Sequence, residues 1–184
     1  MQNPFLIGTK TYLRPLEKED APSLKVWIND PEVRCTLNMY RPMNLRDEEE
    51  FIAKATQSEH DLALGIVVKH GDKLIGATGL HRMDFKNRHA SFGIAIGDKG
   101  EWSRGYGNEA THLMVKHGFE TLNFNRIWLY VFEYNARGMR AYEQAGFKRE
   151  GILRQDRYHE GRYENTILMA ILREDWNADK KQTS

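Results

Sequence analysis

The sequence has a single cysteine, Cys35, so the chain can form no internal disulfide. It also lacks any apolar run near the roughly 20 residues that span a bilayer, and nothing near its start resembles a signal peptide. Neither sign of charge is in excess, because 27 Lys and Arg residues face 26 Asp and Glu residues. No overall field therefore recruits nucleic acid or an anionic membrane, and we expect a cytoplasmic protein with local binding sites.

What the chain does contain is enough apolar material for one well-filled core. It has 184 residues, of which 40% are hydrophobic. No linker, low-complexity tract or internal repeat divides it. We predict one domain over residues 1–176, followed by a flexible polar tail over residues 177–184.

The first half of the chain predicts two helices and an antiparallel meander. Asp20 begins the first helix, and Asn44 with Asp47 caps the second, whose buried face would include Leu45, Phe51 and Ile52. Alternating patterns predict strands over residues 10–16, 62–69, 73–80 and 90–96.

The second half changes pattern at residue 97. It predicts a helix over residues 108–122 and a strand over residues 126–133, an order that implies a right-handed crossover and a parallel pair. A short helix from Asn135 to Gly146 and two strands, over residues 148–158 and 163–172, complete the chain. The expected fold is mixed α/β, with a mostly antiparallel sheet of about seven strands, one splayed parallel pair and about four helices.

The segment Glu101–Ala110, EWSRGYGNEA, precedes the long helix directly. Glycines there let the backbone approach a ligand closely, and a helix start offers unpaired N–H groups with the positive end of its dipole. The segment therefore predicts a phosphate or pyrophosphate site.

Two common phosphate motifs fit this segment poorly. Gly105, Gly107 and Ala110 match the G-x-G-x-x-A dinucleotide fingerprint, but residues 97–104 intervene where that fold needs a tight strand-to-helix turn. A P-loop needs Gly-Lys-Ser or Gly-Lys-Thr after the glycines, which is absent here. An NAD-binding module stays as a minor alternative.

A second segment, which follows the first by about thirty residues, indicates the ligand through a resemblance to a known family. SRGYGNEA, followed about thirty residues later by NARGMRAYEQAGF, resembles the acetyl-CoA loop and second conserved segment of the GNAT N-acetyltransferases. The Rim-type branch of this family has similar segments to LRPLEKEDAPSL near the start and to the last two strands. That branch includes the ribosomal-protein N-terminal acetyltransferases, and the spermidine acetyltransferases are similar to it. Trp102 stands where that loop often has Gln or Arg.

The resemblance implies a GNAT fold that binds acetyl-CoA as co-substrate. Its pantetheine arm would pair like an added strand with main-chain groups of Ile94, Ala95 and Ile96. The residues implied for the pyrophosphate loop are Trp102, Ser103, Arg104, Gly105, Tyr106, Gly107 and Asn108.

The resemblance also assigns roles in the short helix. Asn135 would contact the pantetheine, Gly138 would let the cofactor pass closely, and Tyr142 would donate a proton or hydrogen bond to the departing thiolate. Asn135 and Tyr142 share one helix face. The structural alternatives are that Asn135 only caps the helix and that Tyr142 only packs.

A catalytic base is harder to find in the sequence. Rim-type relatives often carry a glutamate where this chain has Ser91, which can orient a water but is no general base. Freeing an α-amino group at pH 7 costs about 1 kcal/mol, whereas a lysine-like amine costs roughly 4 to 5. The serine thus favours an N-terminal amine, unless Glu133, Glu101 or a histidine serves as the base.

The predicted activity is acetyl transfer from acetyl-CoA to a primary amine, without a covalent acetyl-enzyme. The predicted acceptor is a protein N-terminal α-amine. The alternative acceptors are a polyamine, which the acidic stretch 47–50 would attract, and an amino sugar. The alternative to an enzyme is a protein that binds acyl-CoA without catalysis. No nucleic acid or membrane partner is expected, and a homodimer is allowed. The seven histidines show no metal-ligand spacing, so no metal site is predicted.

Overall fold

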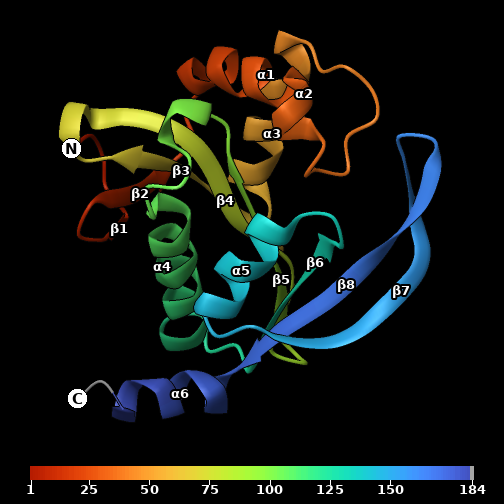
Figure 1. Ribbon diagram of the computed structural model, residues 1–184. Coiled ribbons are helices and arrows are strands. Elements are labelled where there is room, and N and C mark those ends of the chain that lie inside the picture. The colour runs from red at the N-terminus through yellow and green to blue at the C-terminus, as the bar shows by residue number, and fades with distance from the viewer. Residues whose placement is uncertain (183–184) are drawn as a thin grey trace.

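One sheet organises the molecule (Figure 1). The computed structural model describes residues 1–182, with only the backbone for residues 179–182. The sheet has eight strands in the order β1-β2-β3-β4-β5-β6-β8-β7. The strands are β1 (Leu6–Ile7), β2 (Thr11–Pro15), β3 (Leu62–Val68), β4 (Lys73–Asp84), β5 (His89–Ile96), β6 (Arg126–Phe132), β7 (Lys148–His159) and β8 (Arg162–Leu172). Every neighbouring pair is antiparallel except β5 and β6, which run parallel as predicted.

Six α-helices accompany the sheet within residues 1–182. They are α1 (Ala21–Asn29), α2 (Pro31–Arg34), α3 (Leu45–Gln57), α4 (Tyr106–Glu120), α5 (Ala136–Gln144) and α6 (Arg173–Gln182). The expected mixed α/β fold is confirmed, with β1, α2 and α6 as unpredicted additions. The tail predicted from residue 177 falls partly on α6, and residues 183–184 lie outside the described part of the chain.

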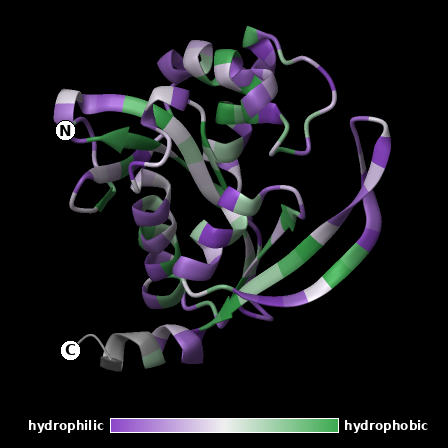
Figure 2. Cartoon of the chain, viewed as in Figure 1, coloured by the Kyte–Doolittle hydropathy of each residue, from purple (hydrophilic) through white to green (hydrophobic). Residues whose placement is uncertain are grey.

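The two faces of the sheet are covered by different helices (Figure 1). One face packs under α4 and α5 in the larger apolar cluster, and α1 and α3 cover the other. Alternation along β3 produces this division, because Leu64 and Ile66 join the larger cluster while Ala63 contacts the smaller one. Apolar positions accordingly follow the strands, and polar ones lie on the outer helix surfaces (Figure 2).

The buried face of α3 differs from the prediction. Its capping box is present, with Asn44 accepting from the Asp47 N–H at 3.2 Å, but Leu45 and Phe51 are about 40% exposed. Ile52 is buried as predicted, at 6% exposure, and Glu48, one turn before it, points inward as well, at 3% exposure. Burial and the charge of Asp47 raise the pKa of Glu48. The periodicity of the apolar residues in α3 could not reveal that the Glu48 carboxylate lies on the inner face.

The first turn of α4 is tied to the β1–β2 turn by Glu109. Its carboxylate accepts from the backbone N–H groups of Thr9 (2.6 Å), Lys10 (3.1 Å) and Thr11 (2.8 Å), and from the Thr11 hydroxyl (2.6 Å). Burial alone would raise the pKa of Glu109, but these hydrogen bonds outweigh it and lower the pKa. The carboxylate thus fixes the helix that carries the predicted anion site.

Because the folded-state pKa of Glu109 is lowered, the stability it contributes is present above its unfolded pKa, about 4.3, and is lost as the pH falls. We expect Glu109→Gln to lower the free energy of unfolding at pH 7 by about 2 kcal/mol. The variant should also lose less stability than the wild type between pH 5 and 3, as thermal unfolding would measure. Glu59→Gln, at an exposed position, is the control. A Glu109→Gln curve parallel to the wild-type curve would contradict this role.

Candidate functional site

The parallel strands β5 and β6 separate soon after they meet. They pair only at His89 with Arg126, Ala90 with Ile127 and Ser91 with Trp128. The remainder of β5 stays paired with β4 on its other side, as far as Ile96. The predicted splay is therefore present, and it leaves one edge of β5 open beyond Ser91.

The backbone groups at this open edge can be assigned from the strand alternation. The Gly97 N–H donates to Ile75 O in β4 at 2.8 Å, so Gly97 and Ala95 direct their backbone groups toward β4. Ile94 and Ile96 direct theirs toward the gap. The Trp102 indole N–H donates to Ile96 O at 2.8 Å, which fits this direction. Of the three predicted strand residues, Ile94 and Ile96 thus direct main-chain groups into the gap, and Ala95 directs its own toward β4.

The loop after β5 prepares the start of α4. Gly105 has φ +84° and is the N-cap of the helix. The first-turn N–H groups of Tyr106, Gly107 and Asn108 have no partner within the helix and point out of its end, where the dipole is positive. A Cβ added at Gly107 would make only ordinary contact with Ile96, at 3.5 Å. Neither the backbone nor the packing of the chain demands glycine there, so the space it leaves is available to a ligand.

A cavity of about 400 Å³ joins this helix start to the gap and to α5. Twelve of the predicted site residues line it, namely Ile94, Ala95, Ile96, Trp102, Ser103, Gly105, Tyr106, Gly107, Asn108, Asn135, Gly138 and Tyr142. Lining residues that the sequence reasoning missed include Val33, Thr36, Thr111, Arg137 and Arg140. Arg104 lies outside the lining, exposed, with an ion pair to Glu101 at 3.3 Å.

Two side chains connect the loop to α5 across the cavity. The guanidinium of Arg137 lies over the Trp102 ring, 3.8 Å from its centroid. Trp102, the residue that departs from the common loop pattern, therefore forms a wall with Arg137. Arg137 and Arg140 also bring positive charge to the cavity beside the start of α4, which suits an anionic ligand.

Tyr142 lies at the inner part of the cavity lining. Its ring packs edge-on against Phe92, with centroids 6.2 Å apart, and against Phe147 at 6.0 Å. No described residue hydrogen-bonds its hydroxyl. Burial raises the pKa of Tyr142 to about 12, so the phenol stays protonated at neutral pH and can donate. The ring of Tyr142 therefore packs against the core, while its hydroxyl is available to donate a hydrogen bond.

Asn135 caps α5, as the structural alternative held. Its Oδ1 accepts from the Gly138 N–H at 2.9 Å, and a Cβ at Gly138 would collide with the Asn135 amide at 2.6 Å. The glycine is therefore explained by the cap itself. Both residues still line the cavity, so their predicted contact with a ligand stays a prediction.

Ser91, predicted to orient a water, and Glu133, a predicted alternative base, lie apart from the cavity lining. The Ser91 hydroxyl donates to the carbonyl of His81 at 3.1 Å, and the exposed Glu133 carboxylate accepts from the Asn165 amide at 2.8 Å. Glu101 lines the cavity but is paired with Lys73, 3.0 Å away, and with Arg104. The catalytic roles of Ser91, Glu133 and Glu101 stay predictions. The single hydroxyl proton of Ser91 is donated to the His81 carbonyl, so it is not available to a water.

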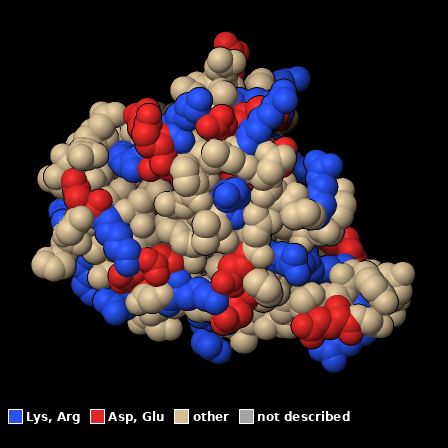
Figure 3. Space-filling view, turned by 90° about the horizontal axis from the view of Figure 1, so that it is seen from above, with Lys and Arg blue, Asp and Glu red and all other residues tan. Residues whose placement is uncertain are grey.

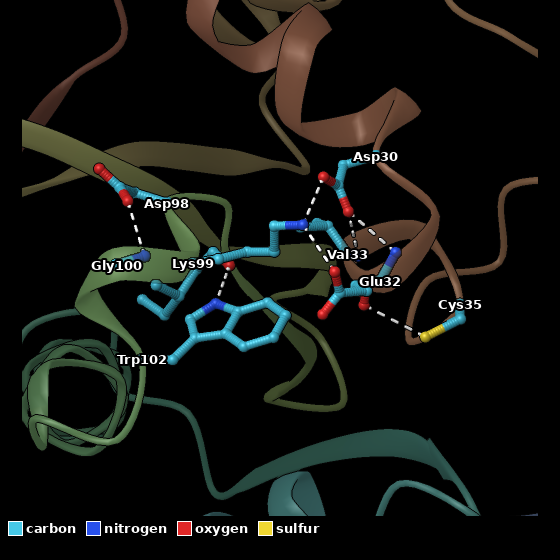
Figure 4. Close-up of polar contacts among 9 residues, drawn as sticks. Asp30, Glu32, Val33, Cys35, Asp98, Lys99, Gly100 and Trp102 are labelled. Atoms are coloured by element: carbon cyan, nitrogen blue, oxygen red, sulfur yellow. Dashed lines mark hydrogen bonds and ion pairs between the residues drawn. The ribbon is translucent and has the colours of Figure 1, made fainter.

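Lys99 joins the loop to α1 and α2 (Figure 4). Its Nζ lies 2.8 Å from Asp30 and 2.7 Å from Glu32, and the hydrogen bond from Lys99 lowers the pKa of Asp30. Asp30 also caps α2, by accepting from the N–H groups of Glu32 and Val33. The cavity wall formed by Val33 and Thr36 is held to the loop in this way.

The comparison with known families decides what this arrangement is. Residues 10–148 match the family model of the acetyltransferase (GNAT) domain. The chain belongs to the GNAT family. The resemblance read from the two motifs is thereby confirmed, and the protein is an acetyl-CoA-dependent N-acetyltransferase.

Two curated relatives align over nearly the whole GNAT chain, and a third aligns over part of it. An uncharacterized N-acetyltransferase, p20, from Bacillus licheniformis is 29% identical over 171 residues, covering 89% of this chain and 93% of its own. The spermidine N(1)-acetyltransferase of Escherichia coli K12 is 26% identical over 180 residues, covering 92% and 89%. A putative ribosomal N-acetyltransferase of Bacillus subtilis, YdaF, is 28% identical over 107 residues, 58% of each chain.

A solved structure shows the same fold. The spermidine N-acetyltransferase of Vibrio cholerae, in complex with CoA and spermine, superposes with a TM-score of 0.86 at 23% identity, covering 92% of this chain and 99% of that one. Within residues 1–182, no helix is long and apolar enough to cross a bilayer. In the same described part, no group of three or more His, Cys, Asp or Glu residues could hold a metal ion.

Proposed function

We propose that this enzyme transfers the acetyl group of acetyl-CoA directly to a primary amine, with the pantetheine arm lying along β5 as an added strand. The observation that carries the proposal is the continuous path from the start of α4, past the open edge of β5, to the hydroxyl of Tyr142. Ile94 and Ile96 supply main-chain partners for the amides of the arm. The N–H groups of Tyr106, Gly107 and Asn108 hold the pyrophosphate.

Tyr142 acts on the leaving thiolate through a hydrogen bond. A phenol of pKa about 12 is a weaker acid than a thiol of pKa about 8.5 by roughly 3.5 units, or about 5 kcal/mol. Full proton transfer to the thiolate is therefore uphill, whereas donation to it stabilises the charge that develops as the C–S bond breaks. Of the two roles predicted for Tyr142, donation of a hydrogen bond is the one the energies favour.

The charges on the acceptor side favour an amine that is not a polycation. The α2 wall carries Asp30 and Glu32, but Lys99 pairs with both carboxylates. Arg34 and Arg41 follow in the same segment. Acidic and basic side chains are interspersed on the face seen from above in Figure 3. We therefore propose a peptide N-terminal α-amine as the acceptor, and spermidine, the substrate named for two relatives, as the second candidate.

The two acceptors are separated by thiol release measured with acetyl-CoA and a panel of amines. The panel holds peptides with a free N-terminus, the same peptides with a blocked N-terminus, spermidine and an amino sugar. We expect the largest kcat/KM for a free N-terminus and no release with the blocked peptide. A larger kcat/KM for spermidine would overturn the proposed acceptor but not the reaction, and no release with any amine would overturn both.

A further inference from the structure

A histidine and a carboxylate lie together beside the gap, outside the cavity lining. His81 in β4 is the cross-strand partner of Ser91 in β5. The Nδ1 atom of His81 is 3.3 Å from Oδ1 of Asp61, which comes from the loop before β3. Asp61 also accepts from the Ser58 hydroxyl at 2.8 Å and from the Arg82 N–H at 3.2 Å. Burial would raise the pKa of Asp61, but these hydrogen bonds and His81 lower it, so the carboxylate is ionised at neutral pH.

The other ring nitrogen of His81 lies over Gly79 of its own strand and next to Gly93 of β5. A Cβ added at Gly79 would lie 2.8 Å from Nε2, and one added at Gly93 would lie 3.6 Å from it. The imidazole therefore lies over two glycines that make room for it. Gly93 immediately precedes Ile94, the first residue of β5 in the cavity lining. Nε2 is thus on the face of the sheet that carries Ser91, beside the residue of β5 that precedes the cavity lining.

The contact with Asp61 fixes which nitrogen can accept a proton. An ionised carboxylate accepts from Nδ1–H, which leaves the lone pair on Nε2. No residue in the described part of the chain hydrogen-bonds Nε2. Asp61 is the charged group in contact with His81, while Ser91, Gly93 and Gly79 around the ring are uncharged, and Arg82 contributes its backbone N–H to Asp61. The pair is a base with an orienting carboxylate, both partly open to solvent.

We propose that His81 takes the proton from the acceptor ammonium, directly or through one water, and that Asp61 is its positioning residue. This inference rests on the proposed acetyl transfer. The ammonium gives one proton to Nε2, which passes it to solvent. The freed amine attacks the thioester carbonyl, the C–S bond breaks, and the second proton of the attacking nitrogen goes to the thiolate. One acetyl amide, one CoA thiol and one solvent proton result.

This assignment accounts for Ser91. The serine stands where a glutamate often serves in Rim-type relatives, yet its hydroxyl donates to the His81 carbonyl. On this proposal the base lies on the strand next to Ser91, and the Ser91 hydroxyl supports the backbone of that residue. With a base present, the serine no longer restricts the acceptor to amines of low pKa.

The test is the pH profile of kcat/KM for wild type, His81→Gln and Asp61→Asn, with the best amine of the panel. We expect His81→Gln to lower kcat by about 10²- to 10³-fold and to remove the acidic limb of the profile, with the CoA dissociation constant unchanged by calorimetry. Asp61→Asn should lower kcat less and shift the limb to lower pH, because an amide no longer stabilises the imidazolium.

His89→Gln is the matched control, since His89 faces Asp84 at 3.7 Å on the same two strands but at the end of β5 away from the cavity. Its profile should match the wild type. Thermal unfolding checks that every variant is folded at the assay temperature, and Asp61→Asn supplies the test if His81→Gln is not. An active enzyme whose variants keep the wild-type limb and kcat overturns this inference alone. A wild type that acetylates no amine overturns the proposed function as well.

Discussion

Replacement of Tyr142 by phenylalanine should lower kcat by about 10²-fold while leaving the affinity for CoA within about twofold. The variant removes one oxygen, and the ring keeps its edge contacts with Phe92 and Phe147. The lost group is the donor to the thiolate, whose charge develops only as the C–S bond breaks, so the loss falls on kcat rather than on binding. Steady-state thiol release and calorimetric titration with CoA measure the two quantities separately.

Tyr163→Phe is the control for this experiment. Tyr163 in the β7–β8 hairpin is 65% exposed and contacts Tyr158. It lies away from the cavity lining, and its variant should have wild-type kinetics. An unchanged kcat for Tyr142→Phe would remove Tyr142 from the chemistry and leave it as a packing residue. A raised CoA dissociation constant with unchanged kcat would show that it acts in binding.

Replacement of Gly107 by valine should weaken acetyl-CoA binding by about 10- to 100-fold. The added side chain grows from the first turn of α4 into the cavity, where it displaces the phosphate from N–H groups worth about 1.5 to 3 kcal/mol each as charged hydrogen bonds. Gly107→Ala should show a smaller loss together with higher thermal stability, because alanine is the better helix former and its Cβ meets Ile96 only at 3.5 Å. Opposite signs for stability and affinity are the expected pattern.

Gly151→Val is the matched control, since a Cβ at Gly151 in β7 would meet nothing within 4 Å. Its CoA dissociation constant should match the wild type in the same titrations. If Gly107→Val bound CoA as tightly as the wild type, the first turn of α4 would not be the pyrophosphate site. If Gly107→Ala lost stability in parallel with affinity, the effect would be structural.

The sequence predicted the part of the site that depends on order along the chain. The strand, helix and strand around residues 90–133 implied a parallel pair, and the loop glycines placed the ligand at the start of α4. The motif residues Asn135 and Tyr142 then fell on the same cavity. These features are local, or follow from the handedness of one crossover, so a single sequence carries them.

The features of the site and fold that the sequence did not reveal depend on contacts between distant segments. His81 and Asp61 are twenty residues apart and meet only because β3 and β4 pair, so neither stood out by spacing. The Arg104 side chain pairs with Glu101, while the role predicted for its backbone in the loop stays a prediction. Glu48 is buried on the inner face of α3, where the sequence predicted only apolar residues. Side-chain direction of this kind is decided by the neighbouring elements, which the linear pattern does not contain.

The ion pairs of Lys99 make ionic strength a variable of the reaction. Lys99 belongs to the loop that precedes α4, and its partners Asp30 and Glu32 lie at the start of α2, which carries the cavity-lining residue Val33. All three side chains are open to solvent, and exposed ion pairs of this kind are screened by salt. We therefore expect the ion pairs between this loop and the α2 wall to weaken as the salt concentration rises. A rate constant for this enzyme has meaning only with the salt concentration stated beside it.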